Sequence, residues 1–195
     1  VLESYGDFKS ILAGHPTRKV PGIEVNSGAL GHGLSVGVGM ALAAKRSGTG
    51  YKTYVLMGDG EHGEGSIMEA AAAAGHYKLD NLVAIIDRNM LQISGKTEEV
   101  MSIENLEAKY HACGWSVRSC NGHDINELTA VLRKTPFEKG NPSFLIAHTV
   151  KGKGVSFMEN RAAWHHKVPS AEELAQAMEE LNLKLENKIH GKYSL

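Results

Sequence analysis

The sequence lacks features that mark several specialised classes of protein. Only two of its 195 residues are cysteines, Cys113 and Cys120, and they do not form a C-x-x-C pair. Two such cysteines favour reduced thiols in a cytoplasmic protein over a disulfide framework. No apolar run approaches the roughly 20 residues that a membrane-spanning helix needs. We therefore expect a cytoplasmic location and no membrane partner.

The sequence also has no excess of charge of either sign. Lysine and arginine number 21 and aspartate and glutamate 22, and neither sign forms a long run. This balance gives no electrostatic footprint for a nucleic acid or a membrane surface, and we expect neither as a partner. The length suits a single domain, residues 1–195, that buries roughly 70% of its extended surface.

What the sequence does contain is an alternation of short apolar runs and helix-like segments. Ser170 with Glu173 forms a capping-box pattern, Asp124 can cap another helix, and Gly37 and Gly39 inside a helix indicate a close backbone approach. Strands are predicted at 52–57, 82–87, 115–119 and 142–149, and helices at 34–45, 65–77, 103–113, 125–134 and 170–187. This order predicts an α/β fold, a doubly wound parallel sheet. Residues 1–27 are expected to be irregular and 187–195 to form a tail.

Two polar residues follow the first two predicted strands. Asp59, in Gly58-Asp59-Gly60, ends the first strand, and Asn89 follows the second strand thirty positions later. Strand, helix and strand in that order predict a parallel βαβ unit, so both residues should lie at one edge of the sheet. A carboxylate and an amide oxygen there suit a magnesium ion that also holds a phosphate-bearing cofactor.

The glycines beside Asp59 strengthen this interpretation, although Asp-Gly is also a common turn dipeptide. Gly58 and Gly60 allow the backbone to approach a phosphate, and the next helix presents its amino end to the same place. A nucleotide-binding α/β domain is the alternative, but the G-x-G-x-x-G fingerprint that it predicts is not found.

The surrounding sequence resembles the transketolases, which carry a thiamine diphosphate signature of GDG followed about thirty residues later by Asn. The similarity covers most of the chain, from about Gly14 to His165, but only the diphosphate-binding domain of the family. It rests on Gly14-His15-Pro16, Pro21-Gly22-Ile23-Glu24-Val25, Gly28-Ala29-Leu30-Gly31-His32-Gly33, Gly58-Asp59-Gly60 with Glu64-Gly65, and Asp87-Arg88-Asn89.

The resemblance implies a role for each matching residue. Asp59, the Asn89 side chain and the Leu91 carbonyl would hold Mg²⁺. The diphosphate would contact Gly60 and Asn89, and the aminopyrimidine would lie beside the backbone of Gly28 and Leu30. Three residues would be catalytic: Glu64 at the contact with a partner's cofactor-activating glutamate, His15 toward the substrate hydroxyls or in a proton relay, and His165 near the diphosphate and the reacting carbon.

The resemblance also implies an incomplete site. The family's pyrimidine-binding domain and two histidines upstream of the matched region have no counterpart here. The chain therefore resembles the N-terminal subunit of a split transketolase, expected to act on sugar phosphates in a heterotetramer with a C-terminal subunit. The implied activity is transfer of a two-carbon ketol unit with thiamine diphosphate and Mg²⁺.

Several alternatives stay open. The chain could be another thiamine diphosphate enzyme, such as a deoxyxylulose phosphate synthase or a 2-oxoacid dehydrogenase subunit, or a non-catalytic relative that only binds a partner. His15 could be an ordinary turn residue and Glu64 a residue that favours a helix start. His166 stands where the family usually has glycine, so the match at His165 could shift by one position. His32 and His62 have no expected role.

Overall fold

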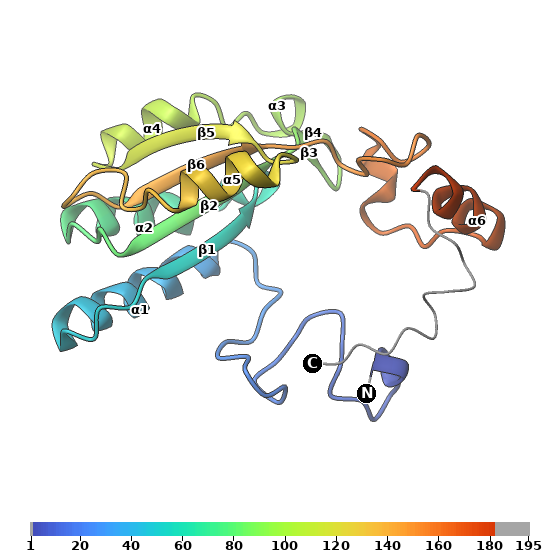
Figure 1. The fold of residues 1–195 in the computed structure, drawn as a ribbon, viewed down its shortest axis with the longest axis horizontal. Helices are drawn as coiled ribbons and strands as arrows, with labels where there is room; N and C mark the ends of the chain where they lie inside the picture. The colour runs from blue at the N-terminus through green and yellow to red at the C-terminus, as the bar shows by residue number, and fades with distance from the viewer. Residues whose placement is uncertain (1, 182–195) are drawn as a thin grey trace.

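Four parallel strands form the central sheet of the computed structural model, which describes residues 2–181 (Figure 1). Their order is β1 (Thr53–Gly58), β2 (Leu82–Arg88), β6 (Ser143–His148) and β5 (Ser116–Asn121), and every neighbouring pair is parallel. β2 and β6 are central and almost wholly buried, as their apolar sequences require. The predicted α/β parallel sheet is confirmed.

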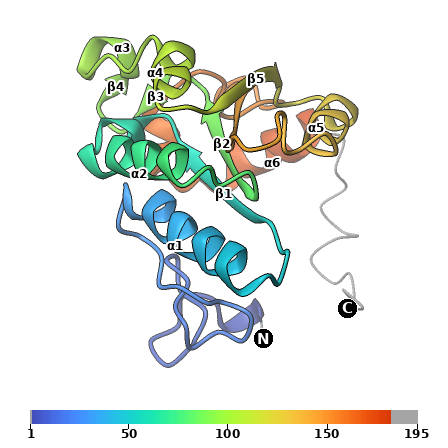
Figure 2. The ribbon, with the colours of Figure 1, turned by 90° about the vertical axis from the view of Figure 1, so that its left-hand side faces the viewer.

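Helices cover both faces of this sheet (Figure 2). On one face the main core joins α1 (His32–Ser47), α2 (Gly65–His76) and α4 (Leu106–Ala112) to the strands. On the other face α5 (Ile125–Leu132) packs through Leu128 and Leu132 on residues of β5 and β6. Consecutive strands alternate with helices, and the sheet is doubly wound as predicted.

Three aromatic side chains form the centre of the main core. The rings of Tyr110 and Phe144 stack with their centroids 3.5 Å apart, and Trp115 meets Tyr110 edge-on at 5.3 Å. The Trp115 indole nitrogen donates to the Ala71 carbonyl at 2.9 Å, so that no polar atom of the ring is left unpaired. The cluster thereby joins α4, β5, β6 and α2.

The glycines predicted to mark a close approach in α1 behave differently from each other. A Cβ on Gly37 would lie 2.4 Å from the Val55 side chain, so this glycine lets α1 sit directly on β1. Gly39 has nothing within 4 Å of the same position, and the prediction is wrong there. Gly75, at the end of α2, has the closest neighbour: its Cβ would overlap the Cys113 carbonyl oxygen.

The predicted helix caps are confirmed. Asp124 accepts hydrogen bonds from the amides of Asn126 and Glu127. Ser170 and Glu173 form a capping box at the start of α6 (Ala171–Glu180). Residues 182–187 of the predicted last helix and the expected tail lie outside the described residues. α4 begins at Leu106, three residues later than predicted, because the side chain of Asn105 caps it.

Several short elements were not predicted. They are η1 (Leu2–Ser4), η2 (Gly60–Gly63), the hairpin of β3 (Leu91–Gln92) and β4 (Gly95–Lys96), α3 (Thr97–Val100) and η3 (Ala162–His165). Residues 5–31 are irregular, as expected for those up to 27, and extend away from the sheet (Figure 1). Cys113 and Cys120 are free thiols. Within residues 2–181, no helix has both the length and the apolar character to cross a membrane.

Phe144→Ala should lower the free energy of unfolding by about 3–5 kcal/mol, because it empties the centre of the aromatic cluster. Urea unfolding followed by tryptophan fluorescence measures the change. Phe8→Ala is the matched control, since the Phe8 side chain is fully exposed and its loss should change stability by no more than about 0.5 kcal/mol. Equal stability of the two variants would contradict the assignment of the core.

Candidate functional site

The ends of β1 and β2 bring the predicted metal ligands to one edge of the sheet. Gly58 pairs in register with Asp87, so the turn that contains Asp59 and the segment that contains Asn89 leave the sheet side by side. β6 lies next to β2, and Thr149, directly after β6, donates its backbone amide to the Arg88 carbonyl at 3.2 Å. Open α/β sheets bind ligands at this edge.

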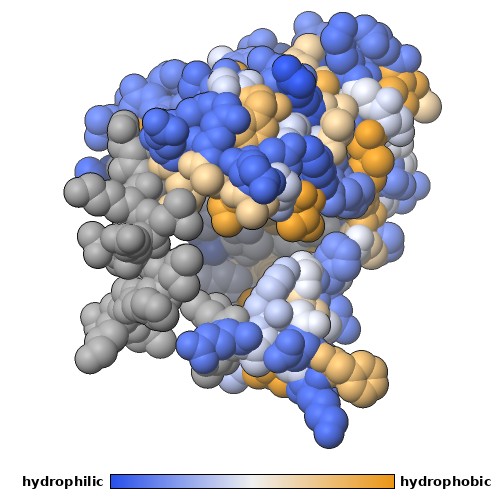
Figure 3. Space-filling view, turned by 90° about the vertical axis from the view of Figure 1, so that its right-hand side faces the viewer, coloured by the Kyte–Doolittle hydropathy of each residue, from blue (hydrophilic) through white to orange (hydrophobic). Residues whose placement is uncertain are grey.

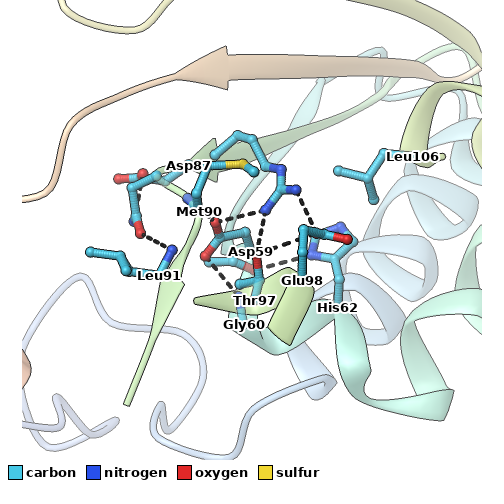
Figure 4. Close-up of polar contacts among 12 residues, drawn as sticks. Asp59, Gly60, His62, Asp87, Met90, Leu91, Thr97, Glu98 and Leu106 are labelled. Carbon is cyan, nitrogen blue, oxygen red and sulfur yellow. Dashed lines mark hydrogen bonds and ion pairs between the residues drawn. The ribbon is translucent and has the colours of Figure 1, made fainter. Parts of the chain in front are cut away.

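The Asp59 carboxylate joins the two strand ends (Figure 4). Its Oδ1 accepts the Gly60 amide at 2.8 Å. Its Oδ2 accepts the Met90 amide at 2.6 Å and lies 3.2 Å from Nη1 of Arg88. Only 1% of Asp59 is exposed, and this burial raises the pKa of its carboxyl against the opposing hydrogen bonds from Met90 and Arg88. A further cation at the carboxylate would compensate for the lost hydration.

Asn89 is oriented by its neighbours. Its Nδ2 donates to Oδ1 of Asp87 at 3.0 Å, and its Oδ1 accepts the Leu91 amide at 3.0 Å. Asp87 also accepts a hydrogen bond from the Thr149 hydroxyl. Between Asn89 and Leu91, Met90 has a positive φ of 66°, a conformation that costs a non-glycine residue on the order of 1 kcal/mol and is concentrated at functional sites.

This donor set fits a magnesium ion that is shared with a phosphate ligand. Asp59 supplies a carboxylate, Asn89 an amide oxygen and Leu91 a backbone carbonyl, all hard oxygen donors. Residues 2–181 contain no cluster of three or more His, Cys, Asp or Glu side chains that could hold a metal without further help. Gly58 has open space beside it, with no atom within 4 Å of the place that a Cβ would take. The protein donors thus leave coordination positions and room for phosphate oxygens.

Arg88 is a site residue that sequence reasoning missed. Its guanidinium group is buried between Asp59 and three residues that follow the β3–β4 hairpin. Nη1 contacts the Thr97 hydroxyl at 2.8 Å, and Nη2 contacts Glu98 at 2.7 Å and Glu104 at 2.8 Å. An arginine at the end of a strand that is otherwise mostly apolar was the available signal, because a buried arginine requires acidic partners nearby. Arg88 connects Asp59 to α3 and to the segment before α4.

His62 is a second residue whose role the sequence did not reveal. Its Nδ1 lies 3.0 Å from the Gly58 carbonyl oxygen and its Nε2 3.1 Å from the Tyr110 hydroxyl. Burial, with the charges of Arg88 and Lys109, lowers the pKa of His62 to about 4. His62 is therefore neutral near pH 7, and it ties the Gly58 turn to the aromatic core.

The loop that precedes α1 contains the predicted aminopyrimidine contacts. Gly28 and Leu30 line a cleft of about 570 Å³. A Cβ on Gly28 would lie 3.2 Å from the His15 ring, so this histidine packs directly on the loop. A Cβ on Gly31 would lie 2.6 Å from Cβ of Glu64, which brings the predicted catalytic glutamate against the same loop. The structure thus brings His15 and Glu64 to the loop on which Gly28 and Leu30 lie.

The predicted catalytic histidine at 165 approaches the site through the β3–β4 hairpin. A Cβ on Gly60 would lie 2.7 Å from Cβ of Gln92, so the Asp59 turn rests on β3. η3 contacts the same strand and ends at His165, whose ring lies 4.6 Å from that of His166. Partial burial, together with the charges of Lys151 and His166, lowers the pKa of His165.

The predicted site residues divide into a buried group and an exposed group. Asp59 is almost inaccessible, whereas His15, Leu30, Glu64 and His165 are exposed. In Figure 3, which views the end of the molecule toward which the strands run, the surface is hollowed between the main body and the N-terminal segment. Among the described residues, the buried Asp59 is therefore surrounded by predicted site residues that remain accessible.

Comparison with known proteins identifies the family of this site. The family model for the transketolase thiamine diphosphate binding domain matches residues 1–190. The chain belongs to the transketolase family. Its Gly58-Asp59-Gly60 turn and Asn89 thus lie in a thiamine diphosphate-binding domain, as the resemblance implied.

Curated members of the transketolase family include close relatives of the chain. It is 58% identical over 195 residues to a subunit of the apulose-4-phosphate transketolase of Phocaeicola vulgatus, covering 98% of the chain and 69% of the relative. The corresponding subunit of Actinobacillus succinogenes is 50% identical, with 92% and 65% covered. The 6-deoxy-6-sulfo-D-fructose transketolase subunit SqwG of a Clostridium species is 41% identical, with 84% and 60% covered. The chain thus spans between 60% and 69% of these relatives.

Solved transketolase structures have the same fold. The crystal structure of Campylobacter jejuni transketolase superposes with a TM-score of 0.87 at 32% identity, covering 93% of this chain and 30% of that one. Pichia stipitis transketolase in complex with sedoheptulose 7-phosphate superposes with a TM-score of 0.89 at 29% identity, covering 98% and 30%. The transketolase-family chain therefore corresponds to less than a third of each of these polypeptides.

His62→Gln should reduce the acid sensitivity of this transketolase-family domain. The folded state disfavours protonation of His62, whose pKa falls from 6.5 to about 4, so the unfolded chain binds that proton more readily. The free energy of unfolding should then decline as the pH drops below about 6.5, with His62 accounting for about 3 kcal/mol at pH 4. Glutamine can keep the hydrogen bonds without titrating.

Urea unfolding of both proteins between pH 7 and pH 4 measures this difference. The carboxylates titrate alike in the two proteins, so the change in slope reports His62. Identical pH dependence in the two proteins would contradict a buried, neutral His62.

Proposed function

We propose that the chain is the cofactor-anchoring subunit of a split transketolase that transfers a two-carbon ketol unit between sugar phosphates. The observation that carries the proposal is the buried Asp59 carboxylate, which joins the ends of β1 and β2 at the position of the family's metal ligand. Membership of the transketolase family supports it, and so does the likeness to relatives that are themselves named as transketolase subunits.

In this proposal the chain holds thiamine diphosphate through Mg²⁺. Asp59, the Asn89 side chain and the Leu91 carbonyl bind the ion, and the backbone around Gly58 and Gly60 approaches the diphosphate. When bound, the cofactor supplies the electron sink that carbon–carbon bond cleavage between a ketose and an aldose requires. The protein's own contribution is to orient the metal ligands: Arg88 and the Met90 amide fix one oxygen of Asp59, and Asp87 fixes the Asn89 amide.

The exposed group of residues is proposed to face a partner subunit. Leu30, Glu64, His15 and His165 are accessible in this chain. A C-terminal subunit with the pyrimidine-binding domain would cover them, exclude water and place its activating glutamate near Glu64. We propose that the assembly is a cytoplasmic heterotetramer, with two copies of each subunit.

The names of the relatives indicate a class of substrate. Those named above are transketolase subunits for apulose 4-phosphate and for 6-deoxy-6-sulfo-D-fructose, both anionic sugars. We propose a phosphorylated ketose as donor. His15 and His165 would contact its hydroxyl groups and reacting carbon. The likeness to transketolases favours this activity over the other thiamine diphosphate enzymes considered above.

The chain alone should show no ketol transfer, because half of the cofactor site is contributed by another polypeptide. Addition of the separately encoded pyrimidine-domain subunit, thiamine diphosphate and Mg²⁺ should restore transfer from a ketose phosphate to an aldose phosphate. A coupled assay that follows the released aldose phosphate measures it, with pyruvate as the control donor. Full activity of this chain by itself would refute the split site, and turnover of pyruvate alone would favour a different thiamine enzyme.

Asp59→Asn should weaken Mg²⁺-dependent binding of thiamine diphosphate at least about a hundredfold, because losses of even outer-shell partners cost 10–100-fold. The fold should persist, since asparagine matches the shape of aspartate and its Oδ1 can still accept the Met90 amide. Calorimetric titration of the assembly of both subunits measures binding, and thermal unfolding measures the fold. Asp7→Asn is the control, an exposed aspartate outside the site. Unchanged cofactor affinity in the Asp59 variant would show that the metal site is misassigned.

A further inference from the structure

Glu61 connects two segments of the chain, one at Gly31 and one at Gly58. Its Oε1 accepts the amide of Gly31 at 2.8 Å, and its Oε2 accepts the amide of Gly58 at 3.3 Å. Gly31 belongs to the loop before α1, and Gly58 begins the turn that contains Asp59. One carboxylate thus bridges the two loops that the proposed function assigns to opposite ends of the cofactor.

The Gly31 end of this bridge is held from more than one side. The Ser66 hydroxyl donates to the Gly31 carbonyl at 2.8 Å, while Glu61 accepts the amide of the same residue. Gly31 has a positive φ of 78°, and a Cβ there would lie 2.6 Å from Glu64 and 2.7 Å from Ser66. The loop therefore approaches η2 and α2 as closely as a backbone can, in a conformation that suits glycine.

The bridge also compensates for a missing helix cap. Gly31 is the N-cap residue of α1 and has no side chain to accept the free amides of the first turn. The Glu61 carboxylate lies at this positive end of the helix, where a negative charge is favourable. The carboxylate also lines the cleft of about 570 Å³ beside Gly28 and Leu30.

We propose that Glu61 is a positioning residue that sets the distance between the aminopyrimidine loop and the diphosphate turn. The inference rests on the proposed function, because it assumes that Gly28 and Leu30 border one end of thiamine diphosphate and Gly58 to Gly60 the other. Glu61 itself touches neither the metal ligands' oxygens nor the reacting atoms. It acts through the two backbone amides that it binds. The affinity of a ligand that spans both loops therefore depends on the distance between the loops.

The proposal predicts that a change at Glu61 affects the binding of a long ligand more than that of a short one. Thiamine diphosphate occupies both loops, whereas inorganic pyrophosphate with Mg²⁺ needs only the diphosphate turn. Glu61→Gln replaces one acceptor oxygen with an NH₂ group and so breaks one half of the bridge, while volume and shape stay nearly the same. It should weaken binding of thiamine diphosphate about tenfold, the effect of losing a hydrogen bond to a charged group. Binding of pyrophosphate should stay within about twofold.

Calorimetric titration of the assembly of both subunits with each ligand, at saturating Mg²⁺, measures this difference. Glu61→Ala breaks both halves of the bridge and should increase the effect on thiamine diphosphate. Glu69→Gln is the matched control: it lies on exposed α2 surface, makes the same chemical change and should alter neither affinity. Hydrogen exchange of the cofactor-free chain gives a readout independent of activity, since the Gly31 amide should exchange faster in Glu61→Ala, which removes both acceptor oxygens, than in the control.

The possible results test the role of Glu61 separately from the proposed function. Equal weakening of both ligands, or unchanged affinity for thiamine diphosphate, would overturn the role of Glu61 and leave the proposed function standing. Unchanged exchange at Gly31 would show that the bridge does not hold the loop in solution. Failure of the unaltered assembly to bind thiamine diphosphate would instead overturn the proposed function, and this inference with it.

Discussion

The hydrogen bonds of the buried Asp59 carboxylate are the interaction on which the rest of the site depends. A carboxylate removed from water is unfavourable unless donors or cations surround it. Here the Gly60 amide, the Met90 amide and Arg88 serve this purpose, and they come from two adjacent strand ends. The same contacts that make burial tolerable also give the carboxylate oxygens a defined direction, as a preorganised binding site requires.

The turn around Asp59 is supported from the sides as well. His62 holds the Gly58 carbonyl and reaches the aromatic core through Tyr110, while Glu61 holds the Gly58 amide and reaches the loop before α1. Arg88 reaches α3 through Thr97 and Glu98. His62, Glu61 and Arg88 therefore fasten the turn to three different parts of the fold. Such support suits a site whose ligands must stay within a fraction of an ångström.

The buried strands that lead to the site contrast with the accessible residues around it. The strands β2 and β6 are buried on both faces, whereas His15, Leu30 and His165 lie on irregular segments and are exposed. This division matches the proposed arrangement, in which one polypeptide fixes the cofactor's charged end and a second closes the site. The transketolase-family relatives from Phocaeicola vulgatus and Actinobacillus succinogenes are likewise named as subunits and not as whole enzymes.

The sequence by itself determined the order of the elements, the parallel sheet and the meeting of Asp59 with the segment of Asn89. These follow from local patterns: apolar runs, helix caps at Asp124 and Ser170, and the rule that parallel strands end at one edge. Only the tertiary structure decided the partners of Arg88, His62 and Glu61, because each contacts atoms from a different element. Their contacts depend on how helices and loops pack over the sheet, which no local pattern of residues records. The β3–β4 hairpin escaped prediction for a related reason, since strands of two residues carry too little periodicity to be seen.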